Sequence, residues 1–211
     1  MKQIFLLTLL SFTGLACAQS LQNEEAQPKG FHQHDGFFAS LGIGGSPGNV
    51  YLSDAIENLT YAGTGFEADL KLGGAIAPNF ILHATLINKQ LNDKKPIGLQ
   101  YVANSATRER TFSESIVGAG ITYYLMPYNA YVSLSLGLGS FSVAEQATGK
   151  TTPSPRGPAF QLKLGKEWWV AKNWGIGLGI TYEKINLQAP ADNGNVISSE
   201  HIGVLFNATF N

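Results

Sequence analysis

The sequence predicts an all-β fold: an eight-stranded antiparallel up-and-down transmembrane β-barrel with short periplasmic turns and long extracellular loops. Apolar residues alternate with small or polar ones from Phe37 to the end of the chain, as in strands with two different faces. Short and long connections alternate between these segments. Charged residues make up 14% of the chain, well below the roughly 25% of soluble domains. No stretch approaches the 18 consecutive apolar residues of a spanning helix.

Residues 1–18 are predicted to be a cleavable signal peptide. Lys2 supplies a positive charge, Ile4 to Leu10 form a mostly apolar run, and Ala16-Cys17-Ala18 offers small residues for cleavage. The run is too short for a membrane anchor, which needs about 20 residues.

Cleavage after Ala18 would remove Cys17, the one cysteine of the chain, and leave no disulfide. Lipidation of Cys17 is the alternative, although Gly14 stands where a lipoprotein usually carries a branched apolar residue. Residues 19–35 are expected to form a polar N-terminal tail, and residues 36–211 the barrel.

Eight segments with a period of two are the predicted strands. In 132–139, for example, valine and leucine alternate with serine and glycine. The segments are 37–44, 66–73, 80–87, 117–124, 132–139, 160–165, 174–183 and 201–210. Three tight connections each carry an asparagine, which tolerates left-handed turn geometry; they are 77–79, 126–129 and 171–173. The other four are long: 45–64, 88–111, 142–158 and 184–199.

The apolar face is expected to meet lipid and the glycine-rich face to line a narrow lumen. A soluble barrel or sandwich would bury the apolar face instead, but glycine is a poor choice for a solvated strand surface. Aromatic residues of the apolar face gather near both ends of the strands, as in interfacial girdles. They are Phe37, Phe80, Tyr123, Trp168, Trp174 and Phe210 at one end, and Phe66, Phe160 and Tyr182 at the other.

The last strand ends in Phe206-Asn207-Ala208-Thr209-Phe210, and Gly165-Lys166-Glu167-Trp168-Trp169-Val170 lies on a middle strand. With the eight-strand pattern, the first segment resembles the small OmpA/OmpX-type outer-membrane barrels, over residues 36–211. The second, followed by Asn173-Trp174-Gly175, resembles a recurring segment of uncharacterised outer-membrane barrel proteins. The resemblance implies an outer-membrane location, contact with lipopolysaccharide and with the barrel insertion machinery, and a role in envelope integrity, adhesion or host contact. That family usually ends on an aromatic residue; here Asn211 follows Phe210.

Charged side chains on the glycine-rich face are predicted to form a network inside the lumen. Buried charges must be paired or reach water, so a structural core of ion pairs is expected; an acid–base site or a proton path is the alternative. The predicted members are Glu67, Asp69, Lys71, His83, Glu114, Lys163, Glu167, Glu183 and His201. Glu183 and His201 end adjacent strands and are expected to be neighbours.

The second long loop carries a surplus of three positive charges. Lys89, Lys94, Lys95, Arg108 and Arg110 stand against Asp93 and Glu109. Such a cluster would attract lipopolysaccharide phosphates; an ordinary soluble loop is the alternative.

Three further motifs are expected to have no chemical role. Gly44-Gly45-Ser46-Pro47-Gly48 matches the hydrolase pattern G-x-S-x-G but lies after an antiparallel strand, without the required strand-to-helix turn. Gly149-Lys150-Thr151 lacks the first glycine of a phosphate loop. His32, His34 and Asp35 could bind a transition metal, but a solvated linker is preferred.

The expected function is therefore that of a monomeric structural or surface-interaction protein acting through its extracellular loops. An eight-stranded barrel is just wide enough for side chains to fill its interior, so the lumen is expected to be closed. No catalytic residue, cofactor, metal or nucleic-acid partner is predicted, the net charge being −1. A narrow channel for small solutes is the alternative, and a lipid-modifying enzyme a third reading.

Overall fold

The computed structural model describes residues 33–53, 58–91, 110–145, 151–188 and 196–211, and the regular elements in them are strands. No helix in those ranges is long and apolar enough to cross a membrane. The strands are β1 (Phe37–Ser53), β2 (Asn58–Ala77), β3 (Phe80–Leu91), β4 (Arg110–Leu125), β5 (Ala130–Glu145), β6 (Thr151–Pro153), β7 (Gly157–Ala171), β8 (Trp174–Gln188) and β9 (Val196–Phe210).

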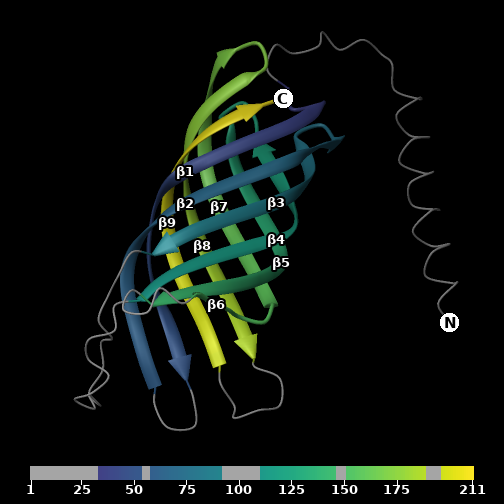
Figure 1. Ribbon diagram of the computed structural model, residues 1–211. Coiled ribbons are helices and arrows are strands. Elements are labelled where there is room, and N and C mark those ends of the chain that lie inside the picture. The colour runs from purple at the N-terminus through teal and green to yellow at the C-terminus, as the bar shows by residue number, and fades with distance from the viewer. Residues whose placement is uncertain (1–32, 54–57, 92–109, 146–150, 189–195) are drawn as a thin grey trace, which may run out of the picture. The chain divides into compact units, whose positions relative to one another are not determined.

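These strands form a closed antiparallel barrel (Figure 1). They pair in the order β4-β3-β2-β1-β9-β8-β7-β5-β6, and β4 also pairs with β5, which closes the ring. The three-residue β6 pairs with β5 at Ser142 to Ala144, and β7 pairs with β5 at Ala130 to Gly139. β6 and β7 both pair with β5, at successive parts of its length, so together they occupy one position in the wall. The wall therefore has eight positions, and the predicted eight-stranded up-and-down fold is confirmed.

The three predicted tight turns close one end of the barrel, here called the turn end. Asn79 and Asn129 adopt left-handed φ angles of 62° and 52°, which asparagine accepts more readily than most residues. Asn173 was expected to adopt the same geometry, but it is not among the residues with positive φ. The opposite end is called the loop end.

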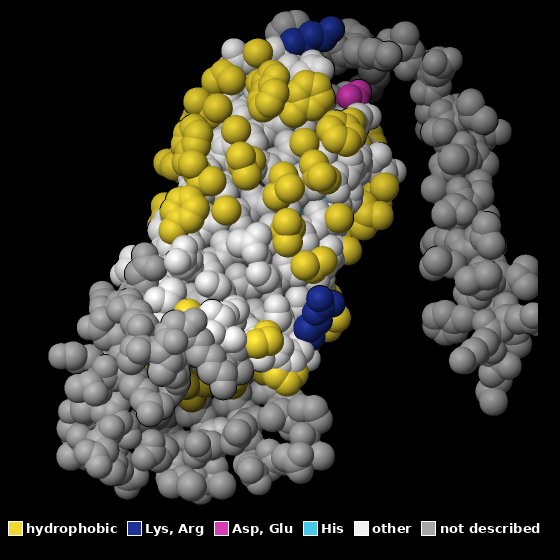
Figure 2. Space-filling model, in the orientation of Figure 1, with side chains coloured by type: hydrophobic (Ala, Val, Ile, Leu, Met, Phe, Trp, Pro, Cys, Tyr) yellow, Lys and Arg dark blue, Asp and Glu magenta, His cyan; other side chains and the backbone are white. Residues whose placement is uncertain are grey.

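Side-chain parity follows the predicted pattern in the membrane-spanning part. On β5, Leu136 points outward and is 61% exposed, whereas Ser135 points inward and is 2% exposed. On the face that Figure 2 shows, apolar and aromatic side chains gather on the outer wall toward the turn end. This belt is the surface that meets lipid.

The strands run further toward the loop end than predicted. β1 was expected to end at Gly44 and continues to Ser53, while β3 was expected to end at Ile87 and continues to Leu91. The four loops were therefore predicted too long. Paired strands include most of the expected loop 45–64 and the ends of the expected loops 88–111, 142–158 and 184–199. The remaining tips, 54–57, 92–109, 146–150 and 189–195, lie outside the described residues.

The two faces of the wall exchange character in these extensions. Beyond the belt the outward positions are polar; they include Asn88, Gln90, Ser113, Ser142 and Asn186. The inward positions become apolar: Val50, Tyr61, Ile87, Leu91, Phe112, Ile116, Phe141, Ile185 and Leu187 are buried. A wall that has left the hydrocarbon meets water outside, so its apolar side chains belong inside.

Candidate functional site: the barrel interior

The candidate site is the interior of the barrel, because the polar groups of the described residues converge there. All nine side chains of the predicted charge network are buried: each is at most 3% exposed. They come from six of the eight wall positions, so strand parity alone brings together residues that lie far apart in the sequence.

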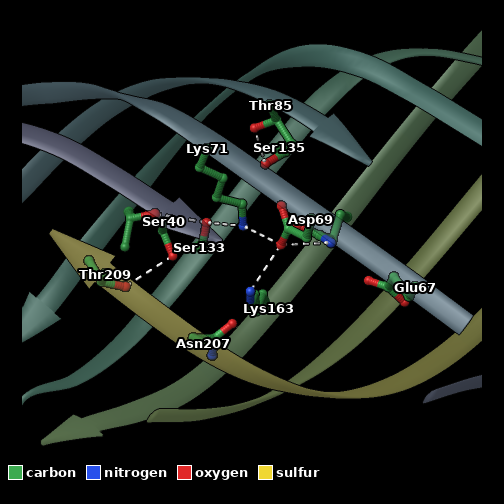
Figure 3. Close-up of polar contacts among 12 residues, drawn as sticks. Ser40, Glu67, Asp69, Lys71, Thr85, Ser133, Ser135, Lys163, Asn207 and Thr209 are labelled. Carbon is green, nitrogen blue, oxygen red and sulfur yellow. Dashed lines mark hydrogen bonds and ion pairs between the residues drawn. The ribbon is translucent and has the colours of Figure 1, made fainter. Parts of the chain in front are cut away.

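Asp69 joins two lysines from opposite parts of the wall. Its Oδ2 lies 2.9 Å from Lys163 Nζ on β7 and 3.4 Å from Lys71 Nζ on β2. Figure 3 shows both ammonium groups directed at the same carboxylate. One acid thus pairs with two buried cations, and the group of three carries a formal charge of +1.

A hydroxyl network supports this ion cluster from β3, β4 and β5. Lys71 Nζ donates to Ser133 Oγ at 3.1 Å, and Thr122 Oγ1 donates to the same oxygen at 2.8 Å. His83 bonds Thr122 through Nε2 and Thr85 through Nδ1. His83 therefore contacts hydroxyls rather than a carboxylate, which suits a neutral ring with one donor and one acceptor nitrogen.

Lys89 departs from its expected place. It was assigned to the second loop as a lipopolysaccharide contact, yet its side chain is 4% exposed and lies in the lumen. Its ammonium contacts Glu183, with Glu67 Oε2 at 3.9 Å. The expectation was wrong because β3 continues past Ile87, and position 89 keeps the inward parity of Ile87.

Glu183 and His201 face each other across the β8–β9 pairing, but they bind different partners. Glu183 accepts a hydrogen bond from Gln161 Nε2 at 2.6 Å and pairs with Lys89. His201 Nε2 lies 2.9 Å from Glu114 Oε1, and Ser199 donates to the other oxygen of Glu114 at 2.9 Å. This serine–glutamate–histidine set is not arranged as a nucleophile with its base, since the serine bonds the acid and not the imidazole.

Glu167 lies closest to the turn end. Thr209 Oγ1 donates to it at 2.7 Å and the Tyr124 hydroxyl at 3.4 Å. Nearby, Asn207 donates to the Tyr131 hydroxyl at 2.8 Å. Glu167 is thus held by neutral donors, with no ion pair within 4 Å among the described side chains.

Two apolar clusters accompany the polar groups, and Lys89 and Glu114 alternate with members of the first along β3 and β4. Toward the loop end, Val50, Tyr61, Ile87, Leu91, Phe112, Ile116, Phe141, Ala159, Ile185 and Leu187 form one cluster, here called the loop-end cap. Toward the turn end, Phe38, Ile81, Tyr124 and Tyr131 form the second. The loop-end cap was not predicted from the sequence, because apolar side chains were expected on the outer face and not on the inner one.

His34 closes the turn end, although it was expected to belong to a solvated linker. Its side chain is fully buried, stacks on Tyr124 with the ring centroids 3.5 Å apart, and bonds Asn129 Oδ1 at 2.8 Å. Its carbonyl oxygen accepts the backbone N–H of Asn79 at 3.0 Å. Burial lowers the pKa of the ring below its ordinary 6.5, so the neutral form is favoured.

Among the described residues, the structure brings no ligand-binding group together at the other motifs noted in the sequence. His32 lies outside the described residues, and the described part of the chain holds no group of three metal-binding side chains. Ser46 of the G-x-S-x-G segment is buried within β1, between antiparallel neighbours. Of the remaining basic residues of the second loop, Arg110 begins β4, whereas Lys94, Lys95 and Arg108 lie outside the described residues, as do Gly149 and Lys150.

Comparison with solved structures agrees with this architecture. The outer membrane protease OmpT of Escherichia coli matches with a TM-score of 0.52 and 8% identity, over 87% of this chain and 99% of that one. Ail, the attachment invasion locus protein of Yersinia pestis, matches with a TM-score of 0.46 and 14% identity over 82% of this chain and 99% of that one, in a complex with sucrose octasulfate. OprG of Pseudomonas aeruginosa matches with a TM-score of 0.44 and 11% identity, over 84% of this chain and 97% of that one.

No protein-family model matches the chain, and no curated protein sequence matches it either. At these identities the likeness concerns the fold: the chain has the architecture of a small outer-membrane β-barrel.

Proposed function

We propose that the protein is a closed outer-membrane barrel that acts through its loop end, as a structural or surface-interaction protein and not as a channel. We further propose that residues 1–18 are removed on export and that the barrel inserts as a monomer. The observation that supports the proposal is the interior of the barrel, where buried ion-paired side chains and two apolar clusters occupy the inward positions of the described strands. An ion crossing it would have to leave water and pass the buried aromatic side chains of both ends.

The outer wall supports a contact with lipopolysaccharide. A groove of about 280 Å³ opens beyond the apolar belt, between β4, β5 and the segment after β6. Its lining includes the hydroxyls of Ser113, Ser140 and Ser142 and the guanidinium of Arg156. Hydroxyls suit sugar groups, and arginine suits phosphate.

The basic residues of the second loop extend this proposal. Lys94, Lys95, Arg108 and Arg110 stand against Asp93 and Glu109 between β3 and β4, a surplus of two positive charges. Their attraction for phosphate should decline as salt screens it. Neutralising all four should weaken lipopolysaccharide binding by refolded protein, most clearly at low salt. Unchanged binding at low salt would remove the loop from the proposal.

Conductance tests the closed lumen. Wild-type protein in a planar bilayer should give little or no steady current. Ile185→Ala combined with Phe141→Ala removes two side chains of the loop-end cap and serves as the matched variant, in which brief currents are expected. Large, stable wild-type currents would contradict the proposal and support a narrow channel.

A further inference from the structure

The carboxylate of Glu67 stands apart from the other acids of the lumen. The side chain is 0% exposed, and neither oxygen makes a hydrogen bond of standard geometry to any residue that the structure describes. The ammonium of Lys89 lies 3.9 Å from Oε2 but is engaged by Glu183. In Figure 3, Glu67 lies away from the cluster in which Asp69 binds two lysines.

The immediate surroundings of Glu67 carry an excess negative charge. Glu183 and Ser46 lie beside its carboxylate, and Lys89 is the one lysine that pairs with either acid among the described residues. Two carboxylates and one ammonium leave a formal charge of −1 here, and among the described residues of the lumen five buried carboxylates face three buried lysines. An uncompensated charge is costly in a closed lumen, so buried charges are paired or bind ions.

Unpartnered oxygens from three strands converge next to Glu67. Gly203 of β9 has no Cβ, and side-chain oxygens crowd the position that one would take. Glu67 Oε2, Ser46 Oγ and Thr181 Oγ1 all lie within 3.3 Å of the point that a Cβ at this position would occupy. Ser46 and Thr181 are at most 1% exposed, and among the described residues neither hydroxyl makes a hydrogen bond of standard geometry, although that of Ser46 lies beside the Glu67 carboxylate. The three side chains come from β2, β1 and β8, so the convergence is a product of the fold.

The barrel wall is interrupted at the same place. β1 and β9 pair from Ala39 to Gly45 and again from Gly48 onward, but not at Ser46 and Pro47, and proline has no N–H to donate. A groove of about 450 Å³ opens on the outer surface at this break, lined in part by Pro47, Gly48 and His201. The oxygens therefore lie behind a gap in the hydrogen-bond ladder.

We propose that Glu67, Ser46 and Thr181 bind one hard monovalent cation, of which Na⁺ is the probe. Hard cations prefer oxygen ligands, and a single positive charge would neutralise the excess carboxylate. A calcium ion takes six to eight oxygens, usually with several carboxylates, and the second acid here is already paired with Lys89. The inference is independent of the proposed function at the cell surface.

Cation-dependent stability tests the site. Urea unfolding of the refolded protein in an uncharged detergent would be followed by tryptophan fluorescence at pH 6, 8 and 9, with NaCl replaced stepwise by choline chloride at constant ionic strength. A ligand that binds only the folded state raises stability with its concentration. The wild-type midpoint should therefore rise with Na⁺ and then saturate, and the protein should broaden the ²³Na resonance.

Two near-isosteric variants locate the effect. Glu67→Gln and Thr181→Val should abolish both the Na⁺ dependence and the line broadening. Thr85→Val is the matched control, since Thr85 bonds His83 and Ser135 and lies outside the proposed ligand set; this variant should keep both effects. If Thr181→Val does not fold, Ser46→Ala replaces it.

Three results would overturn the proposal. Wild-type midpoints that depend on pH but not on Na⁺ would mean that Glu67 holds a proton. Stabilisation by Ca²⁺ alone would refute the monovalent assignment. Retention of the Na⁺ effect in Glu67→Gln would place any bound cation elsewhere.

Discussion

Replacing Asp69 with asparagine should destabilise the barrel more than any other single change in the polar layer, because two buried lysines share this one carboxylate. With an effective dielectric constant of about 20, unit charges 2.9 Å and 3.4 Å apart attract by about 6 and about 5 kcal/mol. Much of this is offset, since the variant no longer buries an anion and the amide oxygen still accepts a hydrogen bond. Removing one partner of a buried pair typically costs 3–5 kcal/mol, and we expect a loss of about 4 kcal/mol.

The assay is reversible urea unfolding in lipid vesicles, followed by tryptophan fluorescence. Lys184→Met is the matched control: Lys184 forms an ion pair with Glu200 on the partly exposed outer wall, where such pairs contribute little, and the midpoint should hardly move. The triple variant Asp69→Asn, Lys71→Met, Lys163→Met removes all three charges and should recover most of the loss. A single variant within 1 kcal/mol of wild type, or a triple variant less stable than the single one, would refute the reasoning.

Three further predictions address the loop-end cap, the turn end and the lipid belt. Phe141→Ala should cost about 3–5 kcal/mol in the same assay, as expected for a buried phenylalanine; a loss below 1 kcal/mol would mean that the loop-end cap is loosely packed. His34 has a pKa below 6.5 in the folded state, so the unfolded chain takes up the proton first. Its contribution should be complete above about pH 6.5 and should fall as the pH drops below that value. Hydrogen exchange of the amide bonded to its carbonyl should accelerate from pH 7.5 to pH 5, after correction for the intrinsic rate; slower exchange at pH 5 would contradict the sign. Leu136→Lys should cost about 2–4 kcal/mol in vesicles, whereas Ser142→Lys, outward on the same strand but beyond the belt, should cost little; equal losses would place the belt wrongly.

Where the chain crosses the membrane, sequence periodicity was enough to predict the wall. On β5 the alternation from Val132 to Gly139 gives both the strand and its inner face, because lipid on one side and a crowded lumen on the other impose opposite requirements on successive residues. The asparagines at 79 and 129 likewise mark turns, since the left-handed geometry restricts the choice of residue.

Beyond the lipid belt the same rule predicts the wrong boundaries. The alternation continues through Leu91 and Phe112, but with apolar residues inward, and a search for apolar outer faces ends the strand too early. Lys89 was misplaced for this reason. The sequence also did not predict which side chains bind each other inside the lumen. Parity predicts that Glu114 and Glu183 both point inward, but it does not predict which of them His201 binds. That depends on the stagger of the strands around the ring.

Both ends of the described barrel lie on one side. His34 is tied to the turn end through Asn129, and the backbone N–H of Asn211 bonds the carbonyl of Asn173 in the third tight turn. In an outer-membrane barrel of this kind the tight turns face the periplasm. A folded domain fused after Asn211 would therefore be displayed inside the cell envelope, whereas an epitope inserted between β8 and β9 would be displayed outside. The two positions together form a pair of reporters for the sidedness of insertion in living cells.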